Sequence, residues 1–97
     1  MNNNNDRLMR LEEVLCEIGL KKTPFYSMIK EFEEAYQIEQ NQEIKEEIFC
    51  IYTLIKQKKI GRTSLWSANQ VQQLISLIKN GEVGRITNYI RYKNGDR

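Results

Sequence analysis

Residues 11–30 read LEEVLCEIGLKKTPFYSMIK, and this stretch decides the predicted fold. Leucine and isoleucine recur at helical spacing over residues 8–18, with glutamates on the other side, which is typical of an amphipathic helix. Gly19 ends that pattern, and Thr23-Pro24 is a typical helix start, with threonine as the N-cap and proline as the first helical residue. The stretch therefore predicts a helix, a short turn and a second helix.

The predicted second helix, which we expect to end near residue 35, has one apolar and one polar face. Its apolar face carries Phe25, Met28, Ile29 and Phe32. In a helix-turn-helix protein, outward side chains of this helix enter the major groove of DNA, and cations at its start meet phosphates. The candidate DNA-contacting residues are Lys21, Lys22, Thr23, Tyr26, Ser27 and Lys30. The same periodicity also fits any two antiparallel helices of an all-α domain.

The rest of the chain adds further helices and one short β-prone segment. Isoleucines repeat at helical spacing and predict a helix over about residues 43–58. Residues 62–66 favour one strand of a small hairpin, and Ser67 caps a fourth helix that Asn80-Gly81 closes. Residues 83–92 predict a short last helix. We therefore expect a mainly α fold, a small helix-turn-helix, winged-helix-like domain of four to five helices with at most a short β-hairpin.

A chain of 97 residues fits one domain. Asn2 to Asn5 offer no apolar group, so residues 1–7 are predicted to be disordered, residues 8–93 to form the domain with its inserted 43–58 helix, and residues 94–97 to fray. No window approaches the ~18 uninterrupted apolar residues of a membrane span, and the start lacks the pattern of a signal peptide. We expect a cytoplasmic protein with no membrane partner.

Two cysteines and the absence of histidine narrow the chemistry. Cys16 and Cys50 each lie among apolar neighbours, which predicts buried free thiols, and zinc sites of the common Cys/His types cannot be built. The sequence has no glycine-rich phosphate loop, and no nucleophile has a histidine to activate it. We therefore expect no enzyme activity, no cofactor, no metal and no small-molecule substrate.

Charge is distributed unevenly along the chain. Residues 1–49 carry a net charge of −5 and residues 50–97 carry +7, which together give the overall +2. The basic half begins with a cluster made of Lys56, Lys58, Lys59 and Arg62. Such a cluster is suited to bind a polyanion. It is equally typical of a solvent-exposed helix C-terminus, where positive charges interact favourably with the helix dipole.

Two segments resemble a known class of regulators. The run LMRLEEVLCEIGLKKTPFYSMIK, residues 8–30, is similar to the opening of AlpA-like phage regulators and excisionase-type winged helix proteins, with Phe25-Tyr26 in place of their aliphatic-Tyr pair. Residues 61–75, GRTSLWSANQVQQLI, resemble the wing strand that ends in tryptophan and the closing helix of these families. Together the two segments cover about 38 of the 97 residues.

The resemblance implies a sequence-specific DNA-binding protein that regulates transcription or assists excision of a phage or mobile element. It implies that Lys22, Thr23, Tyr26, Ser27 and Lys30 meet DNA from the helix, that Lys58, Lys59 and Arg62 meet it from the wing, and that Phe25, Ile29 and Trp66 belong to the core. The chain departs from the pattern in two places. Residues 31–58 form an acidic helical insert, and Ser27 stands where the families often have a basic residue.

The insert also raises the question of partners besides double-stranded DNA. The 43–58 helix has more apolar residues than one face requires, so a homodimer through this helix is one hypothesis. The alternative function is a protein-protein interaction module that uses the acidic insert to bind a host or phage partner. A basic-aromatic tail over residues 85–93 is a secondary candidate for nucleic-acid contact.

Overall fold

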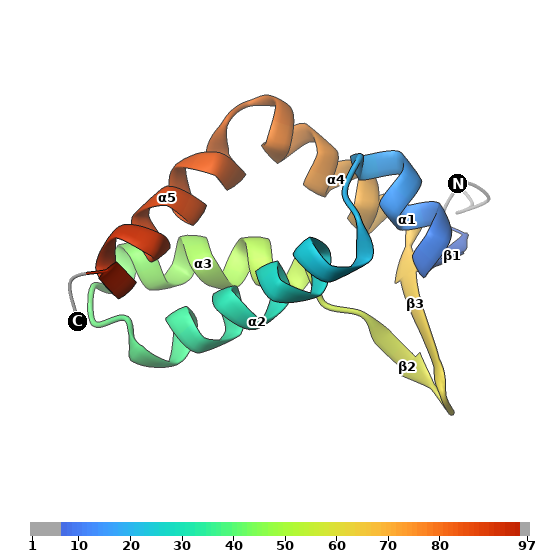
Figure 1. Ribbon diagram of the computed structural model, residues 1–97, viewed down its shortest axis with the longest axis horizontal. Coiled ribbons are helices and arrows are strands. Elements are labelled where there is room, and N and C mark those ends of the chain that lie inside the picture. Colours follow the sequence, from blue (N-terminus) through green and yellow to red (C-terminus); the bar gives the residue numbers. More distant parts are fainter. Residues whose placement is uncertain (1–6, 96–97) are drawn as a thin grey trace, which may run out of the picture.

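The computed structural model describes residues 7–95, which form five helices and a small antiparallel sheet (Figure 1). In chain order the elements are β1 (Leu8–Arg10), α1 (Leu11–Ile18), α2 (Lys22–Ile38), α3 (Gln42–Ile55), β2 (Lys58–Ile60), β3 (Thr63–Ser67), α4 (Ala68–Lys79) and α5 (Glu82–Gly95). The predicted fold class, mainly helical with a short hairpin, is confirmed. The sheet lies at one end of the molecule, and the α2–α3 turn lies at the other.

The predicted helix-turn-helix segment is formed by α1 and α2, with one shift at the start of α2. Gly19 has a left-handed φ of 77° and ends α1 as expected. The N-cap of α2 is Lys21 rather than Thr23, so Pro24 is the third helical residue, not the first. Proline is tolerated there because the first N–H groups of a helix have no intrahelical partner. The helix also extends to Ile38, beyond the predicted end.

A third strand accompanies the predicted hairpin. The strand order is β1-β3-β2, and both pairs are antiparallel. β2 and β3 are joined by Gly61 and Arg62, with a φ of 63° at Gly61 and no positive φ at Arg62, a pattern typical of a type II′ hairpin turn. β1 occupies residues that the sequence placed in the first helix, because its pairing with β3 depends on distant residues.

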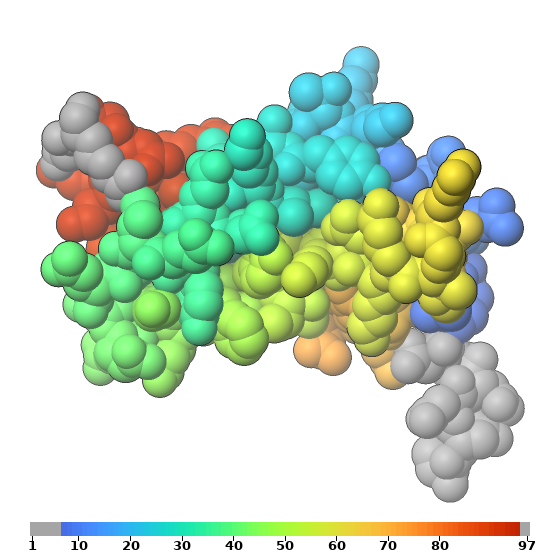
Figure 2. All heavy atoms as spheres, turned by 90° about the horizontal axis from the view of Figure 1, so that it is seen from below, coloured from blue at the N-terminus to red at the C-terminus, as the bar shows by residue number. Residues whose placement is uncertain are grey.

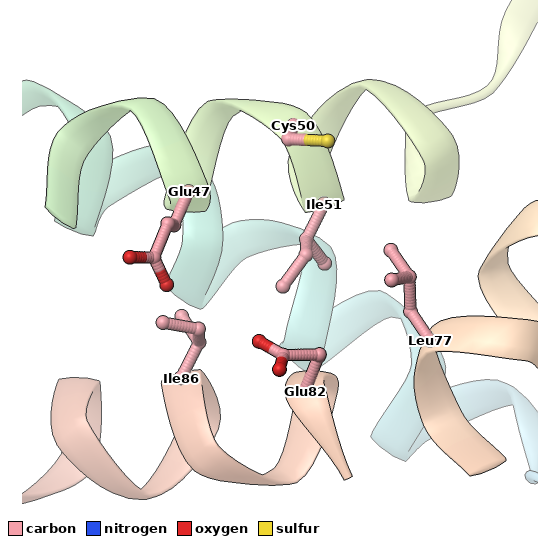
Figure 3. A pocket seen from close by; sticks show the side chains of 6 residues that line it. All are labelled: Glu47, Cys50, Ile51, Leu77, Glu82 and Ile86. Carbon is pink, nitrogen blue, oxygen red and sulfur yellow. The ribbon is translucent and has the colours of Figure 1, made fainter. Parts of the chain in front are cut away.

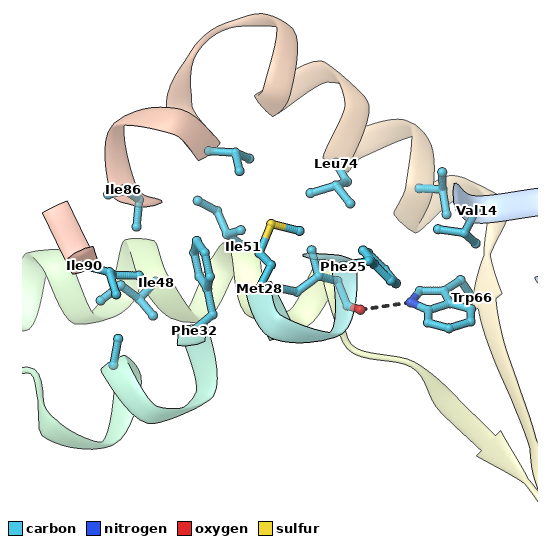
Figure 4. Packing of buried hydrophobic residues seen from close by; sticks show 14 of the residues in the cluster. Val14, Phe25, Met28, Phe32, Ile48, Ile51, Trp66, Leu74, Ile86 and Ile90 are labelled. Carbon is cyan, nitrogen blue, oxygen red and sulfur yellow. Dashed lines mark hydrogen bonds between the residues drawn. The ribbon is translucent and has the colours of Figure 1, made fainter. Parts of the chain in front are cut away.

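The core runs the length of the molecule between α2, α3 and the α4–α5 pair (Figure 4). Its largest fully buried side chains are Trp66, Phe25, Phe32, Ile48, Ile55, Leu74, Ile86, Val14 and Val71. Phe25 and Trp66 are core residues as predicted, and Ile29 packs against the core while part-buried. Trp66 of β3 meets Phe25 of α2 with ring centroids 5.7 Å apart. The sheet is therefore fixed directly onto the helix-turn-helix unit.

The predicted 43–58 helix is α3, which lies at the centre of the fold but ends at Ile55. The predicted end was wrong because Lys58 pairs with Leu65 in the sheet. The helix packs against α2 on one side and against α4 and α5 on another. Ile48, Ile51 and Ile55 are buried, while Tyr52 and Leu54 are partly buried against the core. Packing within the chain thus accounts for most of the apolar surface of this helix. Phe49, 47% exposed, remains at the surface beside the ring of Tyr36.

The ends and the cysteines differ from the sequence expectations. Arg7, placed in a disordered terminus, accepts a hydrogen bond from the backbone N–H of Ala68 and pairs with Glu13. At the other end α5 continues to Gly95, and residues 1–6 and 96–97 lie outside the described part. Cys16 and Cys50 are exposed free thiols, so the prediction of buried thiols is wrong: apolar neighbours in sequence do not share a helix face with them. None of the helices over residues 7–95 is long and apolar enough to span a membrane.

Candidate nucleic-acid interface

The candidate residues of α2 lie on its outward face near the helix start. Lys21, Lys22, Thr23, Ser27 and Lys30 are exposed, and Tyr26 is half-buried. Buried positions of the same helix are Phe25, Met28, Phe32 and Ala35. Helical geometry puts Lys22, Tyr26 and Lys30 in one row, since they are spaced by four residues. The ring of Tyr26 lies 6.0 Å from that of Phe25, so the core limits its movement.

The outward face of α2 changes sign halfway along the helix. Glu33 and Glu34 are exposed and follow Lys30 by three and four residues, which places them on the next turn of the same face. A polyanion is attracted to the first turns of this helix and repelled by the later ones. Only the first part of α2 is therefore suited to contact phosphate, which agrees with reading by the N-terminal residues of a recognition helix.

The hairpin carries the second group of candidates, and all of Lys58, Lys59 and Arg62 are exposed. Figure 2 shows the start of α2 (cyan) and the hairpin (yellow) on one face of the molecule. The register pairs Lys59 with Ser64 and Lys58 with Leu65. Because side chains alternate along a strand, Lys59 shares the sheet face of Trp66, the face that packs against α2, and Lys58 projects from the opposite face. Lys58 and Lys59 are adjacent in sequence, yet their side chains lie on opposite faces of the sheet.

The candidate cations have no internal partners in the described part of the chain. The ion pairs found over residues 7–95 are Arg7–Glu13, Arg85–Glu47, Arg85–Glu82 and Arg91–Glu31. None involves a lysine or arginine of the two candidate groups. Residues 56–67 contain no Asp or Glu, so no carboxylate of the hairpin competes with an external anion. Both groups keep their full charge available for an anionic ligand.

The basic residues of α5 are in the opposite situation. Arg85 donates to Glu82 at 2.7 Å and also pairs with Glu47 of α3, and these two hydrogen bonds raise the pKa of its guanidinium. Arg91 pairs with Glu31 of α2 at 3.5 Å. The hydroxyl of Tyr89 donates to Glu39 at 3.1 Å; partial burial, and then this hydrogen bond, raise its pKa. The arginines of the 85–93 tail are thus already occupied by carboxylates of the acidic insert.

A polar arrangement that the sequence analysis missed fixes the base of the hairpin. The side-chain amide of Gln70, on α4, donates to the backbone carbonyls of Thr53, Leu54 and Lys56 at 3.3, 2.8 and 2.9 Å. The indole N–H of Trp66 donates to the carbonyl of Ile55 at 2.9 Å (Figure 4). These four bonds, which we name the α3 cap, satisfy the last carbonyls of α3, groups that have no intrahelical partner.

The sequence contains a signal for part of this arrangement. Ser67 and Gln70 form the S-x-x-Q pattern of a capping box, in which Gln70 also accepts from the backbone N–H of Ser67 at 3.1 Å. That pattern identifies Gln70 as a residue of the helix start. Its contact with α3 depends on tertiary packing, and Gln70 is only 8% exposed.

The surface hollows differ in size, and two mainly apolar ones, beside Met28 and beside Leu54, have volumes of about 290 and 260 Å³. Figure 3 shows a smaller one between α3 and the α4–α5 pair, of about 100 Å³, where Ile51, Leu77 and Ile86 lie near the carboxylates of Glu47 and Glu82. That volume is below the roughly 300–1,000 Å³ of ligand pockets. Both carboxylates are bound by Arg85. Over residues 7–95 no group of three or more His, Cys, Asp or Glu side chains is placed to hold a metal ion.

Comparisons with known proteins leave the family open. No family model matches the sequence, and no curated protein or solved structure matches the chain. The similarity to AlpA-like and excisionase-type regulators therefore stays a prediction based on residues 8–30 and 61–75.

Proposed function

We propose that this protein binds double-stranded DNA, with the first turns of α2 in the major groove and the β2–β3 hairpin on the adjacent backbone. One observation carries the proposal: α2 and the hairpin each present cations without a carboxylate partner, and the Phe25–Trp66 contact connects these two elements. Thr23, Tyr26 and Ser27 supply hydroxyls between the cations of α2, and side chains of this kind bond to base edges or phosphates.

The arrangement of strands supports the same proposal. In winged helix proteins the hairpin lies beside the recognition helix, and β1-β3-β2 is a sheet in which the hairpin is anchored by a third strand. Here the hairpin is anchored by Met9 opposite Trp66, both buried. We propose that the protein acts in the cytoplasm as a transcriptional regulator or as an excisionase-like accessory factor of a phage or mobile element, and that its role is binding rather than catalysis.

Binding to duplex DNA over a salt series tests the proposal. A protein with ~4–6 phosphate contacts gives a log affinity that falls against log salt with a slope of roughly −4 to −5. The sharper form compares Lys22→Ala with Lys79→Ala, which removes an exposed lysine of α4. We expect weaker binding and a slope reduced by about 1 for Lys22→Ala only. Absence of binding by the unaltered protein at low salt contradicts the proposal.

The alternative function, a protein-binding module, rests on a separate observation. Phe49 is 47% exposed, contacts the ring of Tyr36 in a tilted arrangement and lies one helical turn from Glu46, in the acidic insert. An exposed aromatic beside carboxylates fits a protein partner better than DNA. Phe49→Ser leaves DNA affinity unchanged under the first proposal. A protein that binds no DNA, and whose partner is lost with Phe49→Ser, favours the alternative.

The homodimer through the 43–58 helix stays a hypothesis. Most apolar residues of α3 are covered within the chain, so a dimer interface has Phe49 and the surrounding polar side chains to use. Light scattering at micromolar concentration measures the mass, and a strict monomer excludes the dimer at that concentration.

A further inference from the structure

The α3 cap joins three elements at the place where the hairpin leaves the helical body. The four capped carbonyls belong to residues 53–56, and β2 begins at Lys58. The donors come from Trp66, at the end of β3, and from Gln70, in the first turn of α4. The end of α3, which leads into β2, is therefore bonded through side chains to the end of β3 and the start of α4, independently of the strand pairing.

The backbone of the α3–β2 connection has few other restraints. Lys56 is exposed and has an extended conformation, with φ −76° and ψ 132°, and Gln57 lies between the helix and the strand. Rotation at these two residues moves β2 and the hairpin tip relative to α2, while the end of β3 is held by its pairing with β1 and by the Trp66–Phe25 contact. Bonds from Gln70 to the carbonyls of Leu54 and Lys56 hold both sides of the bend, and the two N–H donors of this buried amide are fully used by its three acceptors.

We propose that Gln70 and the indole N–H of Trp66 are positioning residues for the nucleic-acid interface: they fix the angle of the hairpin so that Lys59 and Arg62 reach DNA together with α2. This inference rests on the proposed function. Gln70 is only 8% exposed and touches no external ligand itself. Its effect on DNA affinity passes through the hairpin, and the contacts made by α2 do not depend on it.

A double-mutant cycle on DNA affinity tests whether Gln70 acts through the hairpin and not through α2. In the unaltered background, Arg62→Ala weakens binding about 10-fold, the effect of one lost hydrogen bond to a charged group. In a Gln70→Leu background we expect Arg62→Ala to have less than about a 2-fold further effect, while Lys22→Ala keeps its full effect. Gln72→Leu, an exposed glutamine of the same helix, is the matched control and leaves both effects intact.

Where Gln70→Leu fails to fold, Trp66→Phe replaces it, because phenylalanine keeps an aromatic ring and lacks the N–H that bonds to Ile55. Folding is checked by circular dichroism before affinity is measured. The proposal is wrong if Arg62→Ala has the same effect in every folded background, or if Gln70→Leu weakens the contribution of Lys22 as much as that of Arg62.

A second readout needs no DNA, so it separates this inference from the proposed function. Cys16 and Cys50 are exposed and are first replaced by serine. Spin labels at Ser27→Cys and Arg62→Cys then report the distance between α2 and the hairpin tip. We expect one narrow distance distribution, broadened by Gln70→Leu or Trp66→Phe and unchanged by Gln72→Leu. An unchanged distribution in both cap variants overturns the positioning role even if DNA binding is observed.

Discussion

The hairpin end and the α5 end of this molecule are both basic, yet their cations are used differently. Lys59 and Arg62 have no carboxylate partner among the described residues, whereas Arg85 and Arg91 are bound to Glu47, Glu82 and Glu31. A count of charges does not distinguish these two regions. The ion pairs distinguish the two regions. An unpaired cation can attract an external anion, whereas a paired cation connects two elements of the fold.

The acidic insert has a corresponding role. Glu31 of α2, Glu39 just after α2 and Glu47 of α3 each bond to a side chain of α5. The charge asymmetry of the sequence, acidic first and basic later, is therefore partly the signature of an internal contact. The candidate cations on α2 and the hairpin take no part in these contacts, and the proposed DNA binding uses that smaller set.

The largest expected effect on stability comes from replacing Trp66, which connects the hairpin to the helical core. Trp66→Ala removes a fully buried ring and the bond to the carbonyl of Ile55. We expect a loss of about 3–5 kcal/mol in the free energy of unfolding, measured by urea denaturation. Tyr92→Ala removes an aromatic ring that is 69% exposed, and changes the same quantity by less than about 0.5 kcal/mol.

The comparison of the two basic regions is tested directly by removing three cations from each. Lys22→Ala, Lys59→Ala and Arg62→Ala together should weaken DNA binding by about 100-fold or more and reduce the salt slope by about 3. The matched variant carries Arg85→Ala, Arg91→Ala and Lys93→Ala and loses the same net charge: the two arginines are ion-paired, and the Lys93 ammonium lies 5.7 Å from the centroid of the Tyr89 ring. Its affinity should fall only a few-fold, through long-range charge. Equal losses in the two variants contradict the distinction between paired and unpaired cations.

A smaller effect of opposite sign is expected from the acidic half of α2. Glu33→Gln with Glu34→Gln removes the repulsion beyond Lys30 and should strengthen DNA binding several-fold at low salt, with a smaller gain at high salt. Fluorescence anisotropy at two salt concentrations measures the gain. Glu43→Gln, on the exposed face of α3, serves as the single-charge control. No gain from the α2 pair shows that DNA stays clear of that part of the helix.

The smallest effect concerns the α5 end and depends on pH. Burial and the hydrogen bond to Glu39 raise the pKa of Tyr89 above its ordinary value of 10.0, so the contribution of this hydroxyl to stability is complete below that value. The contribution is lost as pH rises through the folded pKa, because the unfolded chain releases this proton first. Comparison of the unaltered protein with Tyr89→Phe by thermal unfolding should show a modest advantage at pH 7 that disappears above pH ~10. A stability difference between the two proteins that does not change with pH contradicts the raised pKa of Tyr89.

Local patterns in the sequence predicted the helices well. The turn at Gly19 and the cap at Ser67 are found where the sequence placed them, because both depend on neighbouring residues. The strand β1 was missed because Leu8, Met9 and Arg10 suit a helix as well as a strand, and the decisive partner, Trp66, is distant in sequence. The N-cap of α2 was misplaced because proline is tolerated both at the first helical position and later in the first turn, so Thr23-Pro24 does not fix where the helix begins.

The candidate site was predicted in part. Exposure of the α2 residues follows from helical periodicity, whereas Lys58, Lys59 and Arg62 were identified from the basic cluster and the family resemblance. Two features depend on tertiary structure. Strand alternation separates Lys58 from Lys59, and the contacts of Arg85 and Arg91 with the insert require α5 to pack across α2 and α3. Gln70 was missed because a polar residue on an amphipathic helix is ordinarily assigned to solvent.

The α3 cap also bears on the order in which this chain folds. Its bonds join residues 11 to 17 apart in sequence, so α3, the hairpin and the start of α4 form a local unit with small loop-closure entropy. The pairing of Met9 with Trp66 closes a loop that contains α1, α2 and α3. We expect the α3–hairpin–α4 unit to form early and β1 to dock last. In that order the hairpin is in place before the helix-turn-helix segment is fixed beside it.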